Sequence, residues 1–481
     1  MRNILLAAAA TLAITAALTP ADAQTSAQTS APTSAQPAAQ PATAAETRFE
    51  AELAGHAILP AATFAQPPAD APADFRISGR WTGPGNLRVD APESLPGTTG
   101  PAPNGRPTGL ATPFRGQPVQ GFSGIKPVAG EPGAYWVVTD NGFGNRRNSG
   151  DAMLMFHKVR PDFATGQVTV ERTIFLSDPD RRVPFRIATE GTERRYLTGA
   201  DFDLESIQPV AGGFWFGDEF GPHLIETDAE GRVRRVIETT LDGQPLRSPD
   251  HHSLQVPATP TAGVPFRARR SGGYEGMALS PDGRTLYALL EQPLYAPNSD
   301  QPEGAFLRIL EFSTERGAWT GRSLRFRLSQ GATAIGDFNM IDDRRALIIE
   351  RDNGEGDPSL ACAQGQTPPA CFHDPARLKR VVLVDLGAEE DGFVRRIGHI
   401  DLMAIRDPRN LARQRGDRAA NAPANVLTFP FFTIEDVAMV DADHIIVAND
   451  NNLPFSAGRH LTRADDNEFI LLRVPEFLRA R

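Results

Sequence analysis

A pair of strand-like segments recurs five times along this chain of 481 residues, and this repeat restricts the fold more than any other feature. In each copy an apolar segment begins at a polar residue, turns, and continues into a second apolar segment that ends on a carboxylate or an amide. The fullest copy runs from Asp201 to Glu226. Apolar and aromatic runs bounded by Gly and Asp are typical of β-strands and turns. From opening to closing polar residue, the copies are Ser123–Asp140, Glu205–Asp218, Glu275–Glu291, Asp337–Glu350 and Glu435–Asn449.

The spacing within these copies is nearly constant. The two polar residues lie 13–17 positions apart and the differences fall within the turn, which is typical of a repeat. Most copies are followed by further strand-like segments, and four-stranded antiparallel sheets repeated about an axis form a β-propeller. We therefore predict an all-β protein, a six-bladed β-propeller, with five or seven blades, or a β-sandwich, as alternatives. The sixth blade would combine strands near residues 51–59 and 75–81 with the C-terminal strand, and residues 401–422 would form a short helix.

The N-terminus has the pattern of an export signal. Residues 1–23 join a short basic segment to an apolar run and end at Ala21-Asp-Ala23, so we expect a signal peptide cleaved after Ala23. Residues 24–46 consist almost entirely of Ala, Gln, Thr, Ser and Pro, and we expect a disordered linker. Residues 47–481 would form the propeller domain, without an apolar run long enough to span a membrane. The expected location is the periplasm or the exterior.

The net charge limits the classes of binding partner, and the cysteine content indicates a disulfide. The net charge of −10 disfavours nucleic acid and anionic lipid and favours metal ions or neutral and cationic ligands. The two cysteines, Cys362 and Cys371, bracket a turn-rich stretch, and in an exported protein we expect them to form a disulfide. A zinc site there is the weaker alternative, because only His373 lies nearby.

The opening acids of four copies form the first candidate site. Innermost strands of a propeller line its central channel, so equivalent residues converge on one mouth. Carboxylates packed together need a cation, and oxygen ligands suit Ca²⁺ first, then Mg²⁺ or Mn²⁺. The alternative is that each acid only shapes a turn or strand end. Ser123 would take the equivalent place in the first copy, and the expected ligands are Glu205, Glu275, Asp337 and Glu435.

A second group of polar residues closes the second segment of each copy. These residues would line the same face or support the ligands and substrate, and they are Asp140, Asn141, Asp218, Glu219, Glu291, Asn449 and Asp450. Glu205 and His223 are the candidates for catalysis, His223 as a general acid or base, although a single loop histidine is more often structural. An anionic substrate group would be held by Arg351, Lys126, Arg459 or His460, while His251, His252 and His373 are expected on the surface.

Several short motifs resemble a known family. The chain resembles the phytase-like family whose label is "esterase-like activity of phytase", over about residues 50–478. The resemblance rests on Phe122-Ser-Gly-Ile125, Thr139-Asp-Asn-Gly142, Asp203-Leu-Glu-Ser206, Gly217-Asp-Glu-Phe-Gly221, Gly273-Tyr-Glu-Gly276, Ile349-Glu-Arg-Asp352, Phe432-Thr-Ile-Glu-Asp436 and Ala448-Asn-Asp-Asn451. It implies an exported bacterial β-propeller that hydrolyses phosphoesters or carboxylic esters. Propeller phytases bind calcium and use many Lys and Arg for inositol phosphates, whereas this chain has three Lys.

Together these observations predict an exported, metal-dependent hydrolase, expected to be a monomer, that acts on a small-molecule phosphoester or carboxylic ester. Two other functions would use the same acidic mouth. One is a non-catalytic propeller that calcium stabilises and that binds a ligand. The other is a lactonase of the calcium-propeller type.

Overall fold

The computed structural model describes residues 46–83, 94–100, 103–261 and 263–481. The predicted signal peptide and all but Glu46 of the predicted linker lie outside these residues.

Twenty strands of the described chain form five four-stranded antiparallel sheets; a parallel pair at Gln167–Ile58 joins two of them into one larger sheet, and Thr47–Phe49 adds a parallel fifth strand to another. Each sheet begins with the opening strand of one sequence repeat and continues through the closing strand to one or two outer strands. The first two sheets contain β9 (Phe122–Pro127), β10 (Tyr135–Thr139), β11 (Met155–Asp162) and β12 (Gln167–Phe175), then β13 (Leu204–Val210), β14 (Gly213–Asp218), β15 (His223–Asp228) and β16 (Val233–Glu238). The third and fourth contain β19 (Tyr274–Leu279), β20 (Thr285–Leu290), β21 (Leu307–Ser313) and β22 (Ala318–Phe326), then β23 (Ala334–Met340), β24 (Arg345–Arg351), β25 (Lys379–Glu390) and β26 (Phe393–Asp401). The fifth contains β29 (Asp436–Met439), β30 (His444–Ala448), β31 (Asn467–Arg473) and β2 (Glu52–Leu59).

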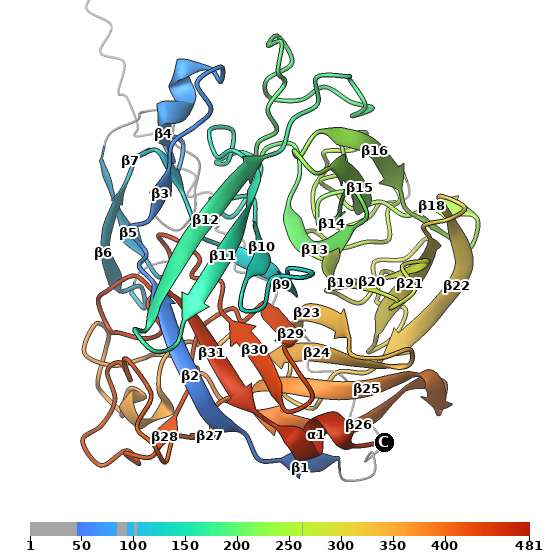
Figure 1. The fold of residues 1–481 in the computed structure, drawn as a ribbon. Coiled ribbons are helices and arrows are strands. Elements are labelled where there is room, and N and C mark those ends of the chain that lie inside the picture. Colours follow the sequence, from blue (N-terminus) through green and yellow to red (C-terminus); the bar gives the residue numbers. More distant parts are fainter. Residues whose placement is uncertain (1–45, 84–93, 101–102, 262) are drawn as a thin grey trace, which may run out of the picture. The chain divides into compact units, whose positions relative to one another are not determined.

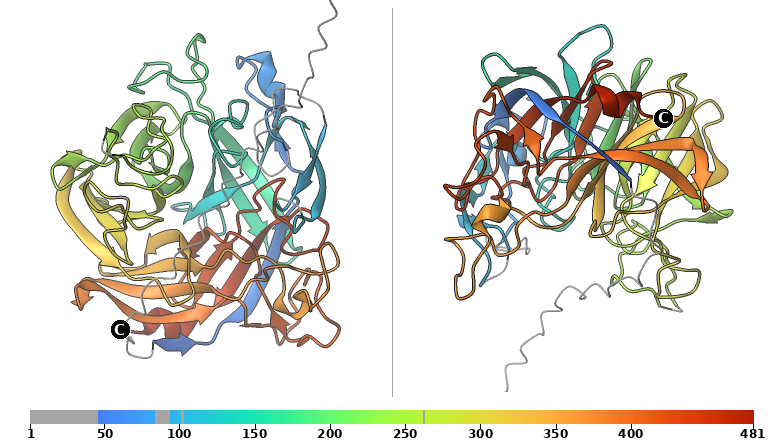
Figure 2. Two further views of the ribbon diagram at one scale, coloured as in Figure 1. Left: turned by 180° about the vertical axis from the view of Figure 1, so that it is seen from behind. Right: turned by 90° about the horizontal axis from the view of Figure 1, so that it is seen from below.

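The five sheets close into a ring. Their first strands β9, β13, β19, β23 and β29 lie innermost, and each contacts the next in cyclic order, β29 returning to β9 (Figure 1). The sheets surround the same centre when the molecule is seen from behind (Figure 2). Five hydrophobic clusters fill the five interfaces between neighbouring sheets, for example Phe156 against Phe216 and Ile446 against Phe122. Burying both faces of every sheet in this way is the architecture of a β-propeller.

In the part of the chain that the structure describes, the ring contains five blades, so the preferred number of six is wrong and the five-bladed alternative fits. The segment expected to supply a sixth blade completes the fifth, because β2 pairs with the C-terminal strand β31 from Glu52–Arg473 to Leu59–Asn467. The last repeat contributes only three strands of its own, and the N-terminal strand fills the outer place. Residues 75–81 contain mainly a 3₁₀ helix and the two-residue strand β4.

The remaining elements are short. The structure shows turns and the strand β27 where a helix over residues 401–422 was predicted, so that prediction is wrong; Asp407 satisfies the backbone there by accepting from Leu411 N at 2.7 Å. None of the helices in the described residues is long and apolar enough to cross a membrane. Cys362 and Cys371 form the predicted disulfide. The other elements are β1 (Thr47–Phe49), β3 (Phe64–Ala65), β4 (Ile77–Ser78), β5 (Leu95–Thr98), β6 (Pro107–Thr112), β7 (Phe114–Arg115), β8 (Gln117–Pro118), β17 (Thr240–Leu241), β18 (Gln244–Pro245), β27 (Ile405–Arg406), β28 (Val426–Leu427), η1 (Ala73–Arg76), η3 (Pro358–Leu360) and α1 (Pro475–Arg479).

Candidate functional site: an acidic mouth of the ring

Irregular pairing at the start of the innermost strands positions the acids. In the second sheet Glu205 is an extra residue between the pairs Leu204–Asp218 and Ser206–Gly217. Glu275 takes the same place in the third sheet, between Tyr274–Leu290 and Gly276–Leu289. Such a β-bulge interrupts the alternation of side chains and re-aims one of them. The repeat therefore directs an acid toward the centre instead of into the packing between blades.

Three of the four predicted ligands come together. Glu205, Glu275 and Glu435 each offer a carboxylate oxygen, and these oxygens lie within 4.8 Å of one another. Glu435 directly precedes β29, so the trio comes from the second, third and fifth sheets. The side chains of the trio are buried, with exposed fractions of 4–7%.

A second trio shares Glu205. Asp203, Glu205 and Glu219 offer oxygens that also lie within 4.8 Å of one another. Asn141 holds Asp203 from the first sheet, with its backbone N at 3.0 Å and its side-chain Nδ2 at 2.6 Å. Asp203 was not among the predicted site residues. Its position two residues before Glu205 was the available signal, because alternate residues of an extended segment share a side.

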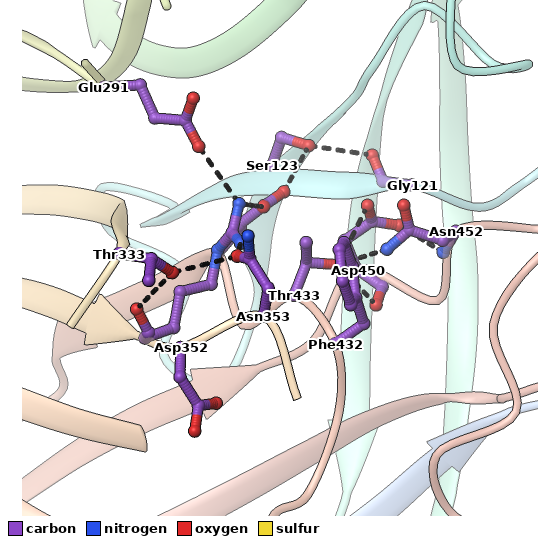
Figure 3. Close-up of polar contacts among 12 residues, drawn as sticks. Gly121, Ser123, Glu291, Thr333, Asp352, Asn353, Phe432, Thr433, Asp450 and Asn452 are labelled. Atoms are coloured by element: carbon purple, nitrogen blue, oxygen red, sulfur yellow. Dashed lines mark hydrogen bonds and ion pairs between the residues drawn. The ribbon is translucent and has the colours of Figure 1, made fainter. Parts of the chain in front are cut away.

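Arg351 and Ser123 complete the mouth beside Glu435. Arg351 Nη2 lies 3.1 Å from Glu291 Oε1 and 3.4 Å from Glu435 Oε1. Ser123 Oγ donates to Glu435 Oε2 at 3.2 Å and also lies 3.3 Å from Gly121 O (Figure 3). Ser123 thus takes the place predicted from the first repeat, and it contacts a carboxylate instead of supplying one.

Burial dominates the electrostatics of the mouth. Burial, together with neighbouring carboxylates, raises the pKa values of Glu205, Glu219 and Glu275 well above their ordinary range. Burial also raises the pKa of Glu435, although Arg351 opposes the rise. The side chains of Glu205 and Asp203, and those of Glu275 and Glu435, are close enough to hydrogen-bond, which favours one shared proton in each pair when no cation is bound.

Asp337 does not join the trio. In β23 two residues, Gly336 and Asp337, lie between the pairs Ile335–Glu350 and Phe338–Ile348, and Asp337 is the second of them. The position equivalent to Ser123 is therefore Gly336. Asp337 Oδ2 accepts from Val437 N at 3.1 Å and Asn339 Nδ2 at 2.8 Å, which ties neighbouring inner strands together. Counting residues in the sequence could not show this offset of one position.

The predicted second group divides into two kinds. Asp140, Glu219, Glu291 and Asp450 belong to the acidic mouth, because each interacts electrostatically with other acids of the mouth and has a raised pKa, caused first by burial. Asn449 instead satisfies backbone groups, accepting from Glu468 N at 2.7 Å and donating to Asp466 O at 3.1 Å. Asp218 accepts from Asp203 N at 3.0 Å and from Gly221 N at 2.8 Å, and so it shapes the turn that follows β14.

Asp436 is a further acid that sequence reasoning missed. Both of its carboxylate oxygens are buried without a hydrogen-bond partner, and burial raises its pKa well above the ordinary value. It follows Glu435 directly and interacts electrostatically with Asp337, Glu435 and Asp450. The acidic region therefore continues from the mouth into the ring.

Apart from Arg351, the predicted basic and histidine residues have other partners. Arg459 is buried against Glu468 at 2.6 Å, so it serves the fifth sheet and not a substrate. Lys126 interacts with Asp337. His223 Nδ1 lies 2.7 Å from Asp218 Oδ2, and His223 groups with His251 and His252 instead of with the glutamates. His251 is buried and His252 half-buried, so the expectation that both lie on the surface is wrong for His251.

The fold and this site define a β-propeller domain whose innermost strands carry buried acids at one mouth of the ring. The family described as "Phytase-like: Esterase-like activity of phytase" matches residues 117–453, which contain nearly all of these acids. The chain belongs to this phytase-like family.

Two other comparisons give distant similarity. An "Uncharacterized secreted protein" of Arthroderma benhamiae is 29% identical over 97 residues, which cover 17% of this chain and 18% of that protein. This chain therefore matches less than a fifth of that relative's length. Among solved structures, a luciferin-regenerating enzyme is 9% identical with a TM-score of 0.31, covering 74% of this chain and 94% of its own. The periplasmic gluconolactonase of Pseudomonas aeruginosa is 12% identical with a TM-score of 0.28, covering 78% and 98%. These two structural similarities are too weak to bear on function.

Proposed function

We propose that this protein is an exported, metal-dependent hydrolase that cleaves phosphoesters or carboxylic esters at the acidic mouth. The observation that carries the proposal is the meeting of Glu205, Glu275 and Glu435 from three sheets, with their oxygens within 4.8 Å, next to Arg351. Membership of a family labelled by phytase and esterase activity supports the class of reaction.

The residues of the mouth fit a hard divalent cation. Every candidate ligand is a carboxylate, and an all-oxygen set suits Ca²⁺ best. Glu275 Oε1 is buried and has no hydrogen-bond partner, so the mouth holds an acceptor that its own donors do not satisfy. The site combines many buried acids with one nearby guanidinium, and a cation would offset the remaining negative charge. Glu205, Glu275 and Glu435 would hold it.

The chain's own residues would then divide the work. A cation bound here would polarise a phosphoryl or acyl oxygen and favour ionisation of a water molecule. Arg351 would orient an anionic group of the substrate, since its guanidinium already bridges Glu291 and Glu435. Glu205, which lies beside Asp203 and Glu219, would hold the reacting water and accept or return its proton. His223 faces other histidines, so we assign it no proton transfer.

The exposure of the mouth limits what can react there. The residues Glu205, Glu219, Glu291 and Arg351 keep exposed fractions of 6–8%, whereas apolar residues such as Ile335 are fully buried. Only the reacting group of a substrate would enter, and the rest would stay outside.

An activity screen tests the proposal. The purified protein would be assayed with p-nitrophenyl phosphate, bis-p-nitrophenyl phosphate, p-nitrophenyl acetate and small lactones, in Ca²⁺, Mg²⁺ or Mn²⁺ and in EDTA. We expect turnover of one class that EDTA abolishes and that Glu205→Gln lowers roughly 100-fold or more, the usual size of a general acid–base contribution. Glu52→Gln, a change on the outer strand β2, is the matched control and should leave turnover unchanged. Absence of turnover with every substrate and cation would refute the proposal.

The near-complete burial of the same acids favours a second candidate, a non-catalytic propeller that calcium stabilises. It predicts that Ca²⁺ raises the melting temperature while no substrate turns over. A lactonase of the calcium-propeller type would instead hydrolyse the lactones in the screen, and Glu205→Gln would abolish that activity.

Export and a monomeric state complete the proposal. The disulfide between Cys362 and Cys371 and a distant relative named as secreted both support an oxidising location outside the cytoplasm. Size-exclusion chromatography with light scattering would test the monomer.

A further inference from the structure

Three histidines meet beside the second sheet, outside the acidic mouth. His223 is the first residue of β15, and His251 and His252 lie on the loop between β18 and β19. His223 and His251 have exposed fractions of 3% and 1%, and His252 is half-buried. One ring nitrogen from each histidine lies within 4.8 Å of the other two. One strand and one loop therefore bring three imidazoles close together.

Three ring nitrogens, one from each histidine, have no hydrogen-bond partner. They are Nε2 of His223, Nε2 of His251 and Nδ1 of His252, and all three atoms are buried. The opposite nitrogens of two rings are occupied, since His223 Nδ1 lies 2.7 Å from Asp218 Oδ2 and His251 Nδ1 lies 2.7 Å from Ser253 Oγ. A carboxylate or hydroxyl behind the outer nitrogen fixes a ring for metal binding and directs the free nitrogen inward.

The surrounding chain is built to hold these rings. A Cβ added to Gly221 would lie 1.9 Å from His223 Nδ1, so any other residue there would displace the ring. Ser248 N donates to Gly221 O at 2.9 Å, and the Ser248 hydroxyl contacts Phe220 O, which fastens the His251–His252 loop to the turn before β15. Phe185 stacks on His252 with ring centroids 4.4 Å apart.

Aromatic stacking explains why the faces of the three histidine rings pack together. It does not explain the unpartnered nitrogens at the edges of the rings. The rings of His251 and His252 lie 4.1 Å apart by centroid, so aromatic packing contributes to the cluster. It leaves three buried nitrogens unsatisfied, and each costs free energy unless something binds it. Glu238 Oε1 lies 3.5 Å from His251 Nε2, without hydrogen-bond geometry, and Arg247 already donates to that oxygen. The nearby Arg146 donates to the backbone O of Ala200 and of Asp250.

We propose that His223, His251 and His252 form a binding site for a divalent transition-metal ion of the Zn²⁺ class, with Asp218 positioning His223. Imidazole nitrogen suits Zn²⁺, and three histidines with an open fourth position are a known zinc coordination set. Zn–N bonds of about 2.0–2.1 Å in a tetrahedral site place the nitrogens about 3.4 Å apart. Nitrogens that lie within 4.8 Å would therefore close by up to about 1.4 Å, and the stacked rings would turn toward the ion. Water or Glu238 would take the fourth position. The ligand chemistry separates this site from the all-oxygen mouth.

Metal titration of the full chain without a histidine tag tests this site. Co²⁺ added to chelator-treated protein should give the intense visible bands of a tetrahedral centre, and Zn²⁺ should displace them at one ion per chain by elemental analysis. His251→Ala should abolish the bands and weaken Zn²⁺ binding roughly 100-fold or more, since even supporting residues around a metal change affinity by about 10–100-fold. His444→Ala, a histidine paired only with Asp441, is the control and should bind like wild type.

Two further variants separate the possible explanations. His252→Phe keeps an aromatic ring against Phe185 but removes the ligand nitrogen, so it should fold, as judged by circular dichroism, and lose the cobalt bands. Glu275→Gln alters only the acidic mouth and should retain them, so failure of the proposed hydrolase would not affect this result. Wild-type protein without cobalt bands, or equal Zn²⁺ binding by wild type and His252→Phe, would overturn the proposal.

Discussion

The acidic mouth and the histidine cluster solve the problem of buried polar groups in opposite ways. The mouth gathers carboxylates from the innermost strands, and their charges repel one another. The cluster gathers imidazoles, which can be neutral, from one strand and one long loop. Its atoms without a hydrogen-bond partner are nitrogens. The mouth should therefore need a hard cation to balance its negative charge. The cluster should need a softer cation only to occupy its unpartnered nitrogens. The acidic mouth arises from equivalent positions of the repeated sheets, whereas the histidine cluster arises from one loop that is not repeated.

The largest expected difference is the pH dependence of stability without a cation. Burial raises the pKa values of Glu205, Glu219 and Glu275 well above about 4, the value in an unfolded chain. Between these values the folded protein binds more protons than the unfolded one, so the free energy of unfolding falls as pH rises. Each carboxyl contributes about 1.4 kcal/mol for each unit of its pKa shift.

Urea unfolding in EDTA between pH 6.5 and 8 measures this loss. Burial lowers the pKa values of His157 and His251 to about 3, and they oppose the trend only below about pH 6.5, where the unfolded histidines take up protons. Stability that stayed level or rose across the window would contradict the interpretation of the mouth.

Calcium should reverse the loss. An ion that binds only the folded protein stabilises it by roughly 3 kcal/mol at a hundredfold excess over its Kd. The gain should be greater at pH 8 than at pH 5, because ligands must lose their protons. Thermal unfolding with and without Ca²⁺ measures it, and His251→Ala should show the same gain as wild type. If His251→Ala lost the stabilisation by calcium, the acidic mouth and the histidine cluster would not be separate sites.

Two neighbouring glutamates should respond oppositely to neutralisation. Glu275 has a buried oxygen without a partner and is hydrogen-bonded to Glu435, so the amide of Glu275→Gln can donate there permanently. Glu435 also pairs with Arg351, so Glu435→Gln leaves that guanidinium with fewer partners. In EDTA at pH 8 we expect Glu275→Gln to stabilise the protein by about 1–3 kcal/mol and Glu435→Gln to destabilise it by a similar amount, the range for a buried polar group that gains or loses its partner. Chemical unfolding of both variants measures their free energies of unfolding. Changes of the same sign in the two variants would contradict this assignment.

The repeated part of the molecule could be predicted from the sequence. The recurrence of Glu205, Glu275 and Glu435 at equivalent positions predicted that they meet. A repeat carries the same information several times, so an error in one copy changes little. The error at Asp337 arose because the bulge of β23 contains two residues, and a one-residue offset turns a side chain to another neighbour.

The unrepeated parts could not be predicted in this way. The number of blades depends on where β2 pairs, and the 408 positions that separate Leu59 from Asn467 give no local signal of that contact. His251 and His252 lie in a loop rich in Pro and Ser, and only the folded ring brings them to His223. Long-range closure and loop packing thus account for the main differences between expectation and structure.

The smallest expected effect lies at Asp218, where the two regions touch. Its Oδ2 lies 2.7 Å from His223 Nδ1, and its Oδ1 accepts from the backbone N of Asp203, a member of the mouth. Asp218→Asn removes the negative charge behind His223 and leaves a single oxygen, which can keep the contact with His223 Nδ1 or the bond from Asp203 N but not both. Zn²⁺ binding should weaken roughly tenfold, the lower end of the effect of residues that support a metal ligand. Isothermal titration with Zn²⁺ and then with Ca²⁺ measures both sites in the same variant. If the two regions are independent, the Ca²⁺ affinity stays at the wild-type value; an equal loss of both affinities would show that Asp218 couples the mouth to the histidine cluster.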